Sequence, residues 1–225
     1  MTTAKASGVT AQSLAGTLAF CSEQRVGLLV ARCPAADLAA AQAMERAGFG
    51  LMDTLVYFSR DVAGPQPEDG AQVAVRDLAA GETGAVVEVA RQAFTGYFGH
   101  YHADPKLERR QCDEVYVDWA RRTCESADRA EGVLVAAAGG RVLAFATMRV
   151  NSAEEGEGVL FGVAPAAQGR GIYRSLMIGG MRWCAARRCR RMVVSTQIAN
   201  LAVQKVWTRL GFEPSGALLT FHKWF

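Results

Sequence analysis

The sequence predicts an α/β (α+β) protein in which helices flank a mixed central sheet. Three observations predict this class: strand-like and helical patterns alternate after residue 70, a Gly-Gly pair joins two strand-like runs, and an unbroken apolar run follows them. The segment 63–70 holds two prolines and two glycines, which favours a linker. Since 225 residues suffice for one or two domains, we expect a smaller N-terminal α/β domain at 1–62 and a larger domain at 71–225.

The composition argues against several classes of protein. Half of the residues are apolar and 21% are charged, as in an ordinary globular chain. The net charge of +3 and the one short basic run, Arg187–Arg191, do not predict a nucleic-acid partner. No apolar run approaches the roughly 18 residues of a membrane span, and no export signal is visible. The six cysteines lack the Cys-x2-Cys spacing of a zinc site. We expect a cytoplasmic protein with reduced thiols, no bound metal and no membrane partner.

The larger domain is predicted to begin with a strand over 71–76. Asp77 then precedes a helix whose apolar positions recur at the spacing of one helical face: Val86, Val87, Ala90 and Phe94. The aromatic segment 95–107 has no clear period, so we expect a loop or a broken helix there. Val115 and Trp119 mark a second helix.

The centre of the predicted sheet follows. Gly139-Gly140 tolerates the positive φ angles of a tight turn, so strands are expected over 132–137 and 141–150. The run 159–163 has no polar alternation, which is typical of a strand buried on both faces. Pro165 ends that strand because proline cannot donate a hydrogen bond to a neighbouring strand.

The C-terminal part is predicted to be helix, strand, helix and strand. A helix begins near Ile172, and the strand 192–196 follows it. Asn200 is expected to cap a helix that Gly211 closes in a left-handed conformation. The last strand is expected over 217–221.

A short sequence pattern occurs near both ends of the chain. Arg46-Ala47-Gly48-Phe49 and Arg209-Leu210-Gly211-Phe212 each end a helical stretch, and a phenylalanine lies ten residues beyond each glycine, Phe58 and Phe221. Residues 1–62 are therefore interpreted as a truncated copy of the C-terminal unit. Chance agreement of so short a pattern is the alternative.

A phosphate-binding turn is predicted after the buried strand. Gln168-Gly169-Arg170-Gly171 precedes a helix, where free backbone N–H groups and the helix dipole attract anions. Glycine also lets an anion approach the backbone closely. On these residues alone, a tight strand-to-helix turn that needs glycine for steric reasons explains the pattern as well.

The turn and a later motif together resemble the GNAT acetyltransferase superfamily. Residues 162–173 look like the acyl-CoA pyrophosphate loop of that superfamily, with Tyr173 in place of the usual final small residue. Asn200, Ala202, Lys205, Gly211 and Phe212 match its later Asn…Gly-Phe helix. The resemblance implies a GNAT fold and acetyl-CoA or another acyl-CoA as cosubstrate. It implies a cofactor site at Phe161, Gly162, Val163, Gln168, Gly169, Arg170, Gly171, Ile172, Tyr173 and Asn200.

The resemblance also implies a reaction, in which an amine attacks the thioester directly beside a splayed central strand. Many members place a tyrosine on the last helix to protonate the leaving thiolate, and Trp207 stands at that position. An indole N–H can orient the sulfur but should not supply a proton, and core packing is the other interpretation. Glu157 lies where some members keep a base, although its acidic neighbours also suggest a solvated loop.

The segment 95–107 lines the acceptor pocket in this fold. Tyr97, His100, Tyr101 and His102 are candidate substrate-binding residues, and His102 is also a candidate catalytic residue. Histidine titrates near neutrality and can relay the proton of the amine, while the aromatic rings can stack on a flat ring. An ordinary surface loop is the alternative.

A narrower resemblance concerns the acceptor. The short N-terminal half, residues 94–107, 116–120 and 195–200 look like the nucleotide-sugar N-acyltransferases related to dTDP-fucosamine acetyltransferase. This implies a dTDP-linked amino sugar as acceptor. The alternatives are a GNAT acting on a protein N-terminus, a lysine or a small amine, and a non-catalytic acyl-CoA-binding sensor. The sequence leaves the oligomeric state open, a homodimer included.

Overall fold

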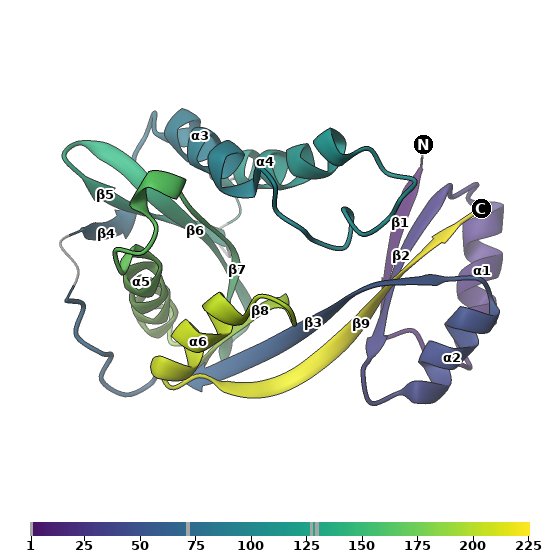
Figure 1. Cartoon of the computed structure of the whole chain (residues 1–225). Coiled ribbons are helices and arrows are strands. Elements are labelled where there is room, and N and C mark those ends of the chain that lie inside the picture. The colour runs from purple at the N-terminus through teal and green to yellow at the C-terminus, as the bar shows by residue number, and fades with distance from the viewer. Residues whose placement is uncertain (1, 71–72, 127, 129–130) are drawn as a thin grey trace.

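A mixed sheet runs through the whole computed structural model, which describes residues 2–70, 73–126, 128 and 131–225. The strand order in the described part is β1-β2-β9-β3-β8-β7-β6-β5-β4 (Figure 1). The strands are β1 (Thr3–Ser7), β2 (Leu28–Pro34), β3 (Gly50–Asp61), β4 (Ala74–Asp77), β5 (Glu131–Ala138), β6 (Arg141–Ser152), β7 (Glu155–Val163), β8 (Arg191–Gln197) and β9 (Glu213–Trp224). The helices are α1 (Leu14–Glu23), α2 (Leu38–Arg46), α3 (Thr83–Phe94), α4 (Arg109–Glu125), α5 (Ile172–Ala186) and α6 (Leu201–Arg209), with a 3-10 turn η1 (Pro165–Ala167). The predicted α/β class with helices around a mixed sheet is confirmed.

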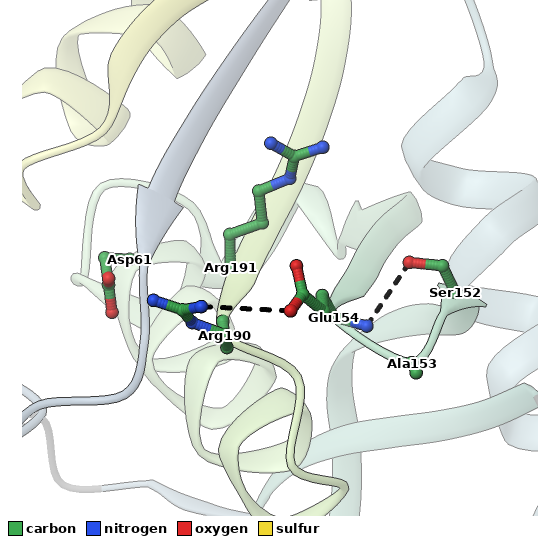
Figure 2. A pocket seen from close by; sticks show the side chains of 6 residues that line it. All are labelled: Asp61, Ser152, Ala153, Glu154, Arg190 and Arg191. Carbon is green, nitrogen blue, oxygen red and sulfur yellow. Dashed lines mark hydrogen bonds and ion pairs between the residues drawn. The ribbon is translucent and has the colours of Figure 1, made fainter.

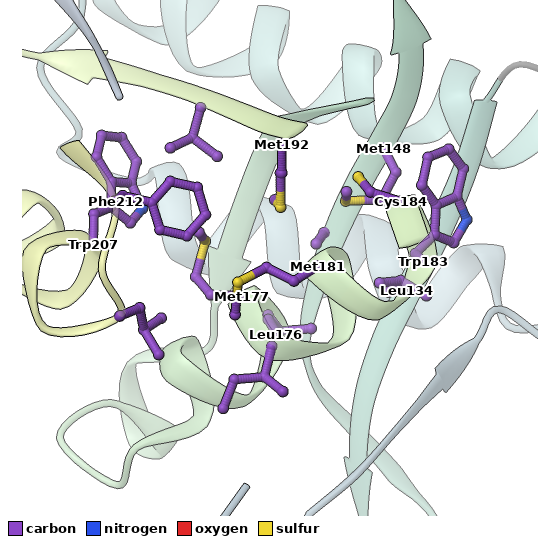
Figure 3. Packing of buried hydrophobic residues seen from close by; sticks show 14 of the residues in the cluster. Leu134, Met148, Leu176, Met177, Met181, Trp183, Cys184, Met192, Trp207 and Phe212 are labelled. Atoms are coloured by element: carbon purple, nitrogen blue, oxygen red, sulfur yellow. The ribbon is translucent and has the colours of Figure 1, made fainter. Parts of the chain in front are cut away.

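Helices cover both faces of the sheet formed by β4 to β8. On β5, Val135 packs with the core under α3 and α4, whereas its neighbours Leu134 and Ala136 pack with the core under α5. Figure 3 shows this second core, in which Met148 and Met192 of the sheet meet Met181 of α5. The alternation follows from the period of two along a strand.

A separate core lies under α1 and α2. It is built from side chains of β2 and the two helices, among them Leu29, Cys21 and Met44. Phe221 of β9 completes this N-terminal core. Conversely, Phe58 of β3, from the N-terminal unit, packs with Trp207 and Phe212 in the core of the larger unit.

The long strands β3 and β9 are thus exchanged between the two units. β9 pairs with β2, and β3 pairs with β8, and the two also pair with each other, all antiparallel. The order β1-α1-β2-α2-β3 also matches the order β7-α5-β8-α6-β9. Gly48 and Gly211 have φ angles of 78° and 77° after their helices. From this correspondence we propose that residues 1–62 are half of a GNAT unit, with 63–70 as the connection.

Most predicted elements of the larger unit are present, with changed ends. Gly139 and Gly140 have positive φ angles of 56° and 73°, as the predicted hairpin requires. Segment 95–107 contains no described helix or strand. The first predicted strand is present as β4, but Ala71 and Gln72 lie outside the described residues. The final strand is longer than expected because β9 continues into the N-terminal unit.

The cysteines and the length of the helices bear on two expectations, reduced thiols and the absence of a membrane span. All six cysteines are free. Among the helices of the described residues, none is both long and apolar enough to cross a membrane.

Candidate functional site

The parallel strands β7 and β8 separate halfway along β7. They pair from Glu155 to Gly158 of β7, and no pairing continues over 159–163. On its other edge β7 stays paired with β6 as far as Val163. The backbone N–H and C=O groups of Phe161 and Val163 that face β8 therefore have no strand partner and can bind an extended ligand. The resemblance to the GNAT superfamily implied such a splay in the central strand.

The turn after β7 presents backbone donors at the start of α5. Gly169 and Gly171 have φ angles of 74° and 77°, which side chains other than glycine rarely adopt. Among the described residues, no backbone carbonyl accepts from the N–H groups of Gly169, Arg170, Gly171, Ile172 or Tyr173. Such donors at a helix N-terminus form an anion site. The site fits a diphosphate chemically.

Two polar side chains fix the backbone at the starts of α5 and α6. Gln168 donates from Nε2 to the carbonyl oxygen of Val163 at 3.3 Å, which ties the turn to the end of β7. Asn200 caps α6, as predicted, by accepting from the N–H of Val203. Its amide also donates to Thr196 Oγ1 at 3.0 Å. Arg170 lines a neighbouring surface pocket of about 550 Å³.

A cleft of about 470 Å³ begins at the splay and crosses β3 toward β1 and β2. Its lining brings together eight of the predicted site residues: Tyr97, His100, Tyr101, Glu157, Phe161, Tyr173, Asn200 and Trp207. The predicted site residues that do not line it are His102, Gly162, Val163, Gln168, Gly169, Arg170, Gly171 and Ile172. The cleft therefore joins three predicted cofactor residues, Phe161, Tyr173 and Asn200, to the predicted acceptor residues in one space.

Trp207 and Tyr173 form a hydrogen-bonded pair in this cleft. The indole Nε1–H of Trp207 donates to Tyr173 Oη at 2.9 Å, and Trp207 is only 1% exposed. Burial raises the pKa of the Tyr173 hydroxyl, against the opposing effect of this hydrogen bond. Tyr173 also packs its ring edge on Phe161. A neutral phenol thus lies beside the splayed strand.

Glu157 belongs to β7 and not to a solvated loop. Its carboxylate pairs with Arg149 of β6, and its side chain is 13% exposed. Glu157 and Arg149 both line the cleft. The side chain is thus placed where it can contact a ligand, and its predicted catalytic role is not tested by this placement.

The segment between α3 and α4 reaches across to β9 (Figure 1). Tyr97 Oη donates to Gln197 Oε1 of β8, and burial raises the pKa of Tyr97 to about 12. His102 Nε2 contacts Asp113 at 3.0 Å, and its Nδ1 accepts from the N–H of Gly99. Both ring nitrogens of His102 are therefore occupied, one by the segment itself and one by Asp113 of α4, and its predicted catalytic role stays a prediction.

His100 lies in a buried polar cluster that sequence reasoning missed. Its Nδ1 lies 2.9 Å from His222 Nε2, and His222 Nδ1 lies 2.7 Å from Asp104 Oδ2. His222 comes from β9, more than 100 residues away along the chain, so no local pattern could have joined these groups.

Two cations from the N-terminal unit were also missed. Lys5 of β1 and Arg32 of β2 line the cleft, and no carboxylate of the described residues forms an ion pair with either. Arg32 donates from Nε to Thr220 Oγ1 at 3.3 Å. Only the strand order brings them to the cleft.

Figure 2 shows a separate pocket that holds none of the predicted site residues. Arg190 there lies 3.8 Å from Glu154, and Arg191 pairs with Glu155 at 2.7 Å. The short basic run is thus partly neutralised by acidic neighbours.

Comparisons with known proteins agree with this geometry. Residues 87–212 match the model of the Acetyltransferase (GNAT) family. Among solved structures, a GCN5-related N-acetyltransferase from Sphaerobacter thermophilus has a TM-score of 0.65 at 15% identity, and the match covers 95% of this chain and 68% of that one. A tandem GNAT protein from the clavulanic acid biosynthesis pathway has a TM-score of 0.61 at 14% identity, with 93% and 68% covered. These likenesses concern the fold.

The curated relatives carry names that point to two different functions. The spore coat polysaccharide biosynthesis protein SpsD of Bacillus subtilis is 26% identical over 64% of this chain and 48% of its own length. A mycothiol acetyltransferase of Amycolatopsis mediterranei is 29% identical over 70% of this chain and 53% of its own length. The chain thus spans about half the length of these relatives. Because the family model matches more than half of the chain and the splay and turn lie inside that match, the chain belongs to the acetyltransferase (GNAT) family.

Proposed function

We propose that the chain is an acyl-CoA-dependent N-acyltransferase whose acceptor is the primary amine of a dTDP-linked amino sugar. The acyl-CoA lies in the splay between β7 and β8, with its diphosphate on the turn 168–173. The unpaired N–H groups of that turn support this assignment, because an anion is the ligand that satisfies them. The family membership of the chain supports it independently.

One observation carries the acceptor half of the proposal: Lys5 and Arg32 form no ion pair among the described residues and line the same cleft as the splay. The acidic group that Arg32 influences is Asp53, where Arg32 opposes the rise of the pKa that burial causes. Two unpaired cations favour an acceptor that carries negative charge. A nucleotide sugar carries a diphosphate between its two rings. Trp119 of α4 lines the cleft although it is 41% exposed, so its ring is available to stack on a base or a sugar.

Similarity to SpsD, which is named for polysaccharide biosynthesis, also supports a sugar acceptor. The mycothiol acetyltransferases support a second candidate, a small amine without a diphosphate. A third candidate is an acyl-CoA-binding sensor without turnover. The cleft supports the enzyme over the sensor, because its lining joins the cofactor end to cationic and titratable groups.

The test is release of free thiol from acetyl-CoA with a panel of dTDP-amino sugars, the matching free amino sugars, the unacetylated precursor of mycothiol, peptides and polyamines. We expect turnover with dTDP-amino sugars and a KM at least tenfold higher for the free amino sugars. Turnover confined to the other amines rejects the acceptor assignment. Tight binding of acetyl-CoA without any turnover would favour the sensor.

The cations give a second arm of this test. Lys5→Ala and Arg32→Ala should each raise the KM for the dTDP-amino sugar about tenfold, since a charge-assisted hydrogen bond contributes about 1.5–3 kcal/mol, and leave the KM for acetyl-CoA unchanged. Arg190→Ala is the matched control, because Arg190 is an exposed arginine in the separate pocket of Figure 2. Equal effects of all three variants would point to general electrostatics and not to a binding site.

A further inference from the structure

A hydrogen-bonded chain of buried side chains ends in the cleft at His100. Asp104, His222 and His100 are 2%, 2% and 8% exposed. Asp104 Oδ2 lies 2.7 Å from His222 Nδ1, and His222 Nε2 lies 2.9 Å from His100 Nδ1. The other ring nitrogen of His100, Nε2, has no hydrogen-bond partner among the described residues, and His100 lines the cleft.

The carboxylate at one end of this chain determines the position of every proton in it. Burial opposes ionisation of Asp104, but hydrogen bonds from His222, the N–H of Lys106 and Trp224 Nε1 outweigh burial and lower its pKa. An ionised Asp104 can only accept, so His222 carries its proton on Nδ1.

The same logic continues from His222 to His100. Burial lowers the pKa of His222, although Asp104 opposes this effect, so His222 is neutral near pH 7 and its Nε2 accepts. His100 must then donate from Nδ1, which leaves a lone pair on Nε2. These hydrogen bonds therefore leave Nε2 of His100 unprotonated and without a partner among the described residues.

We propose that His100 is the general base that takes the proton of the acceptor amine, with His222 and Asp104 as the positioning residues that keep its lone pair on Nε2. This inference rests on the proposed acyl transfer, but not on the identity of the acceptor. The lone pair of the amine forms the C–N bond to the thioester carbonyl carbon, and the carbonyl π electrons move to oxygen. His100 Nε2 then takes a proton from the positively charged nitrogen. The C=O bond re-forms as the C–S bond breaks, and the sulfur leaves with that electron pair and gains a proton from a donor in the cleft.

The charges around His100 favour the neutral base before the acceptor binds. Besides burial, the groups that disfavour its protonation are His222 of β9, Arg32 of β2, Lys5 of β1 and His102 of its own segment. Together they lower its pKa to about 3. Burial is the largest of these causes, and Arg32 and Lys5 contribute less, so negative charge on a bound ligand would offset only part of the lowering of the pKa.

The positions of the protons can be measured directly on the wild-type protein. The 225-residue polypeptide has three histidines, so a two-bond ¹H–¹⁵N correlation spectrum resolves the tautomer of each. We expect His100 and His222 to be protonated on Nδ1. His102 serves as internal control and should be protonated on Nε2, since its Nδ1 accepts from Gly99. A His100 that carries its proton on Nε2 would overturn the proposal.

Kinetics test the role of the lone pair. His100→Ala should lower kcat about 10²-fold, as expected when a general base is lost, with the KM for acetyl-CoA unchanged, and added imidazole should restore part of the rate. Asp104→Asn should lower kcat without changing that KM. Asp113→Asn is the matched control. It alters the contact between Asp113 and His102, and Asp113 does not belong to the hydrogen-bonded series Asp104–His222–His100.

The outcomes separate the two proposals. If the wild-type protein acylates any amine and His100→Ala is unimpaired, the base assignment is wrong and acyl transfer stands. A loss in Asp113→Asn without a loss in Asp104→Asn would move the base to His102. Absence of turnover by the wild-type protein on every amine would overturn both proposals, even if the tautomers are as expected.

Discussion

At the scale of single residues, Trp207, which stands where many family members have a tyrosine, contacts a second departure from the family pattern. The indole does not face the cleft as a free donor, because its N–H is bound to Tyr173 Oη. Tyr173 is itself the other departure, since it replaces a small residue in the turn. The two departures contact each other, and no proton acceptor for the Tyr173 hydroxyl is present among the described residues.

The pair predicts which residue gives a proton to the leaving sulfur. Tyr173→Phe should lower kcat by about 10²-fold, in the range of a lost general acid, while acetyl-CoA still binds. Trp207→Phe keeps the Tyr173 hydroxyl and removes its hydrogen bond together with some core packing, so kcat should fall less than in Tyr173→Phe. Steady-state kinetics with calorimetric binding separates these effects. A larger loss in Trp207→Phe than in Tyr173→Phe would contradict this order.

The buried His100 also predicts how stability depends on pH. Its pKa is about 3 in the folded protein and 6.5 as a free side chain. Between these values the unfolded chain binds one more proton at this site, so the free energy of unfolding should fall by about 1.4 kcal/mol for each unit that the pH drops. Urea unfolding at pH 4.5 and 6.5 measures the slope. His100→Gln should reduce the slope, and an unchanged slope would place the titration elsewhere.

At the scale of elements, the turn 168–173 was predictable because its function depends on local sequence. Two glycines between a buried strand and a helix specify the geometry, and both have positive φ angles. The strands and helices of residues 74–224 were predicted from periodicity for the same reason. By contrast, β1, α1 and β2 were not predicted individually, since α1 has a weak apolar face with two buried residues, Leu14 and Cys21.

The conformation of Gly171 gives a prediction at this scale. Gly171→Ala should weaken the binding of acetyl-CoA at least tenfold, because an alanine disfavours the left-handed conformation by roughly 1–2 kcal/mol and the turn would relax away from it. Gly48→Ala is the matched control, because Gly48 has a φ of 78° after α2 and lies in the N-terminal unit, away from the turn. It should lower stability and leave the affinity unchanged. Equal affinities for both variants would show that the turn conformation does not matter for binding.

At the scale of the whole molecule, the exchange of β3 and β9 explains why the candidate site was only half predictable. The cofactor end lies within residues 157–207, where motifs carry it. The acceptor end is assembled from β1, β2 and the segment 95–107, with β9 behind it. Lys5, Arg32 and His222 follow no motif, and only the sheet order brings them together.

The exchange also predicts how the two halves behave when the connection is cut. A protease site inserted between Gly64 and Gln66 should yield two fragments that still elute together on size-exclusion chromatography. β3 would remain paired with β8 and β9, and Phe58 would stay in the core of the larger unit. Separation into two folded monomers would contradict the strand exchange. Phe58→Ala should lower the free energy of unfolding by about 3–5 kcal/mol and should promote dissociation of the two fragments.

The account depends most on the turn as a diphosphate site. Calorimetry can compare coenzyme A with 4′-phosphopantetheine and with pantetheine, which share the thiol arm and differ stepwise in the phosphate and nucleotide that they carry. Coenzyme A should bind at least 100-fold more tightly than pantetheine, with 4′-phosphopantetheine between the two, because only phosphate groups can accept from the N–H groups of 169–173. Equal affinities for coenzyme A and pantetheine, or no binding of coenzyme A to the folded protein, would contradict the account.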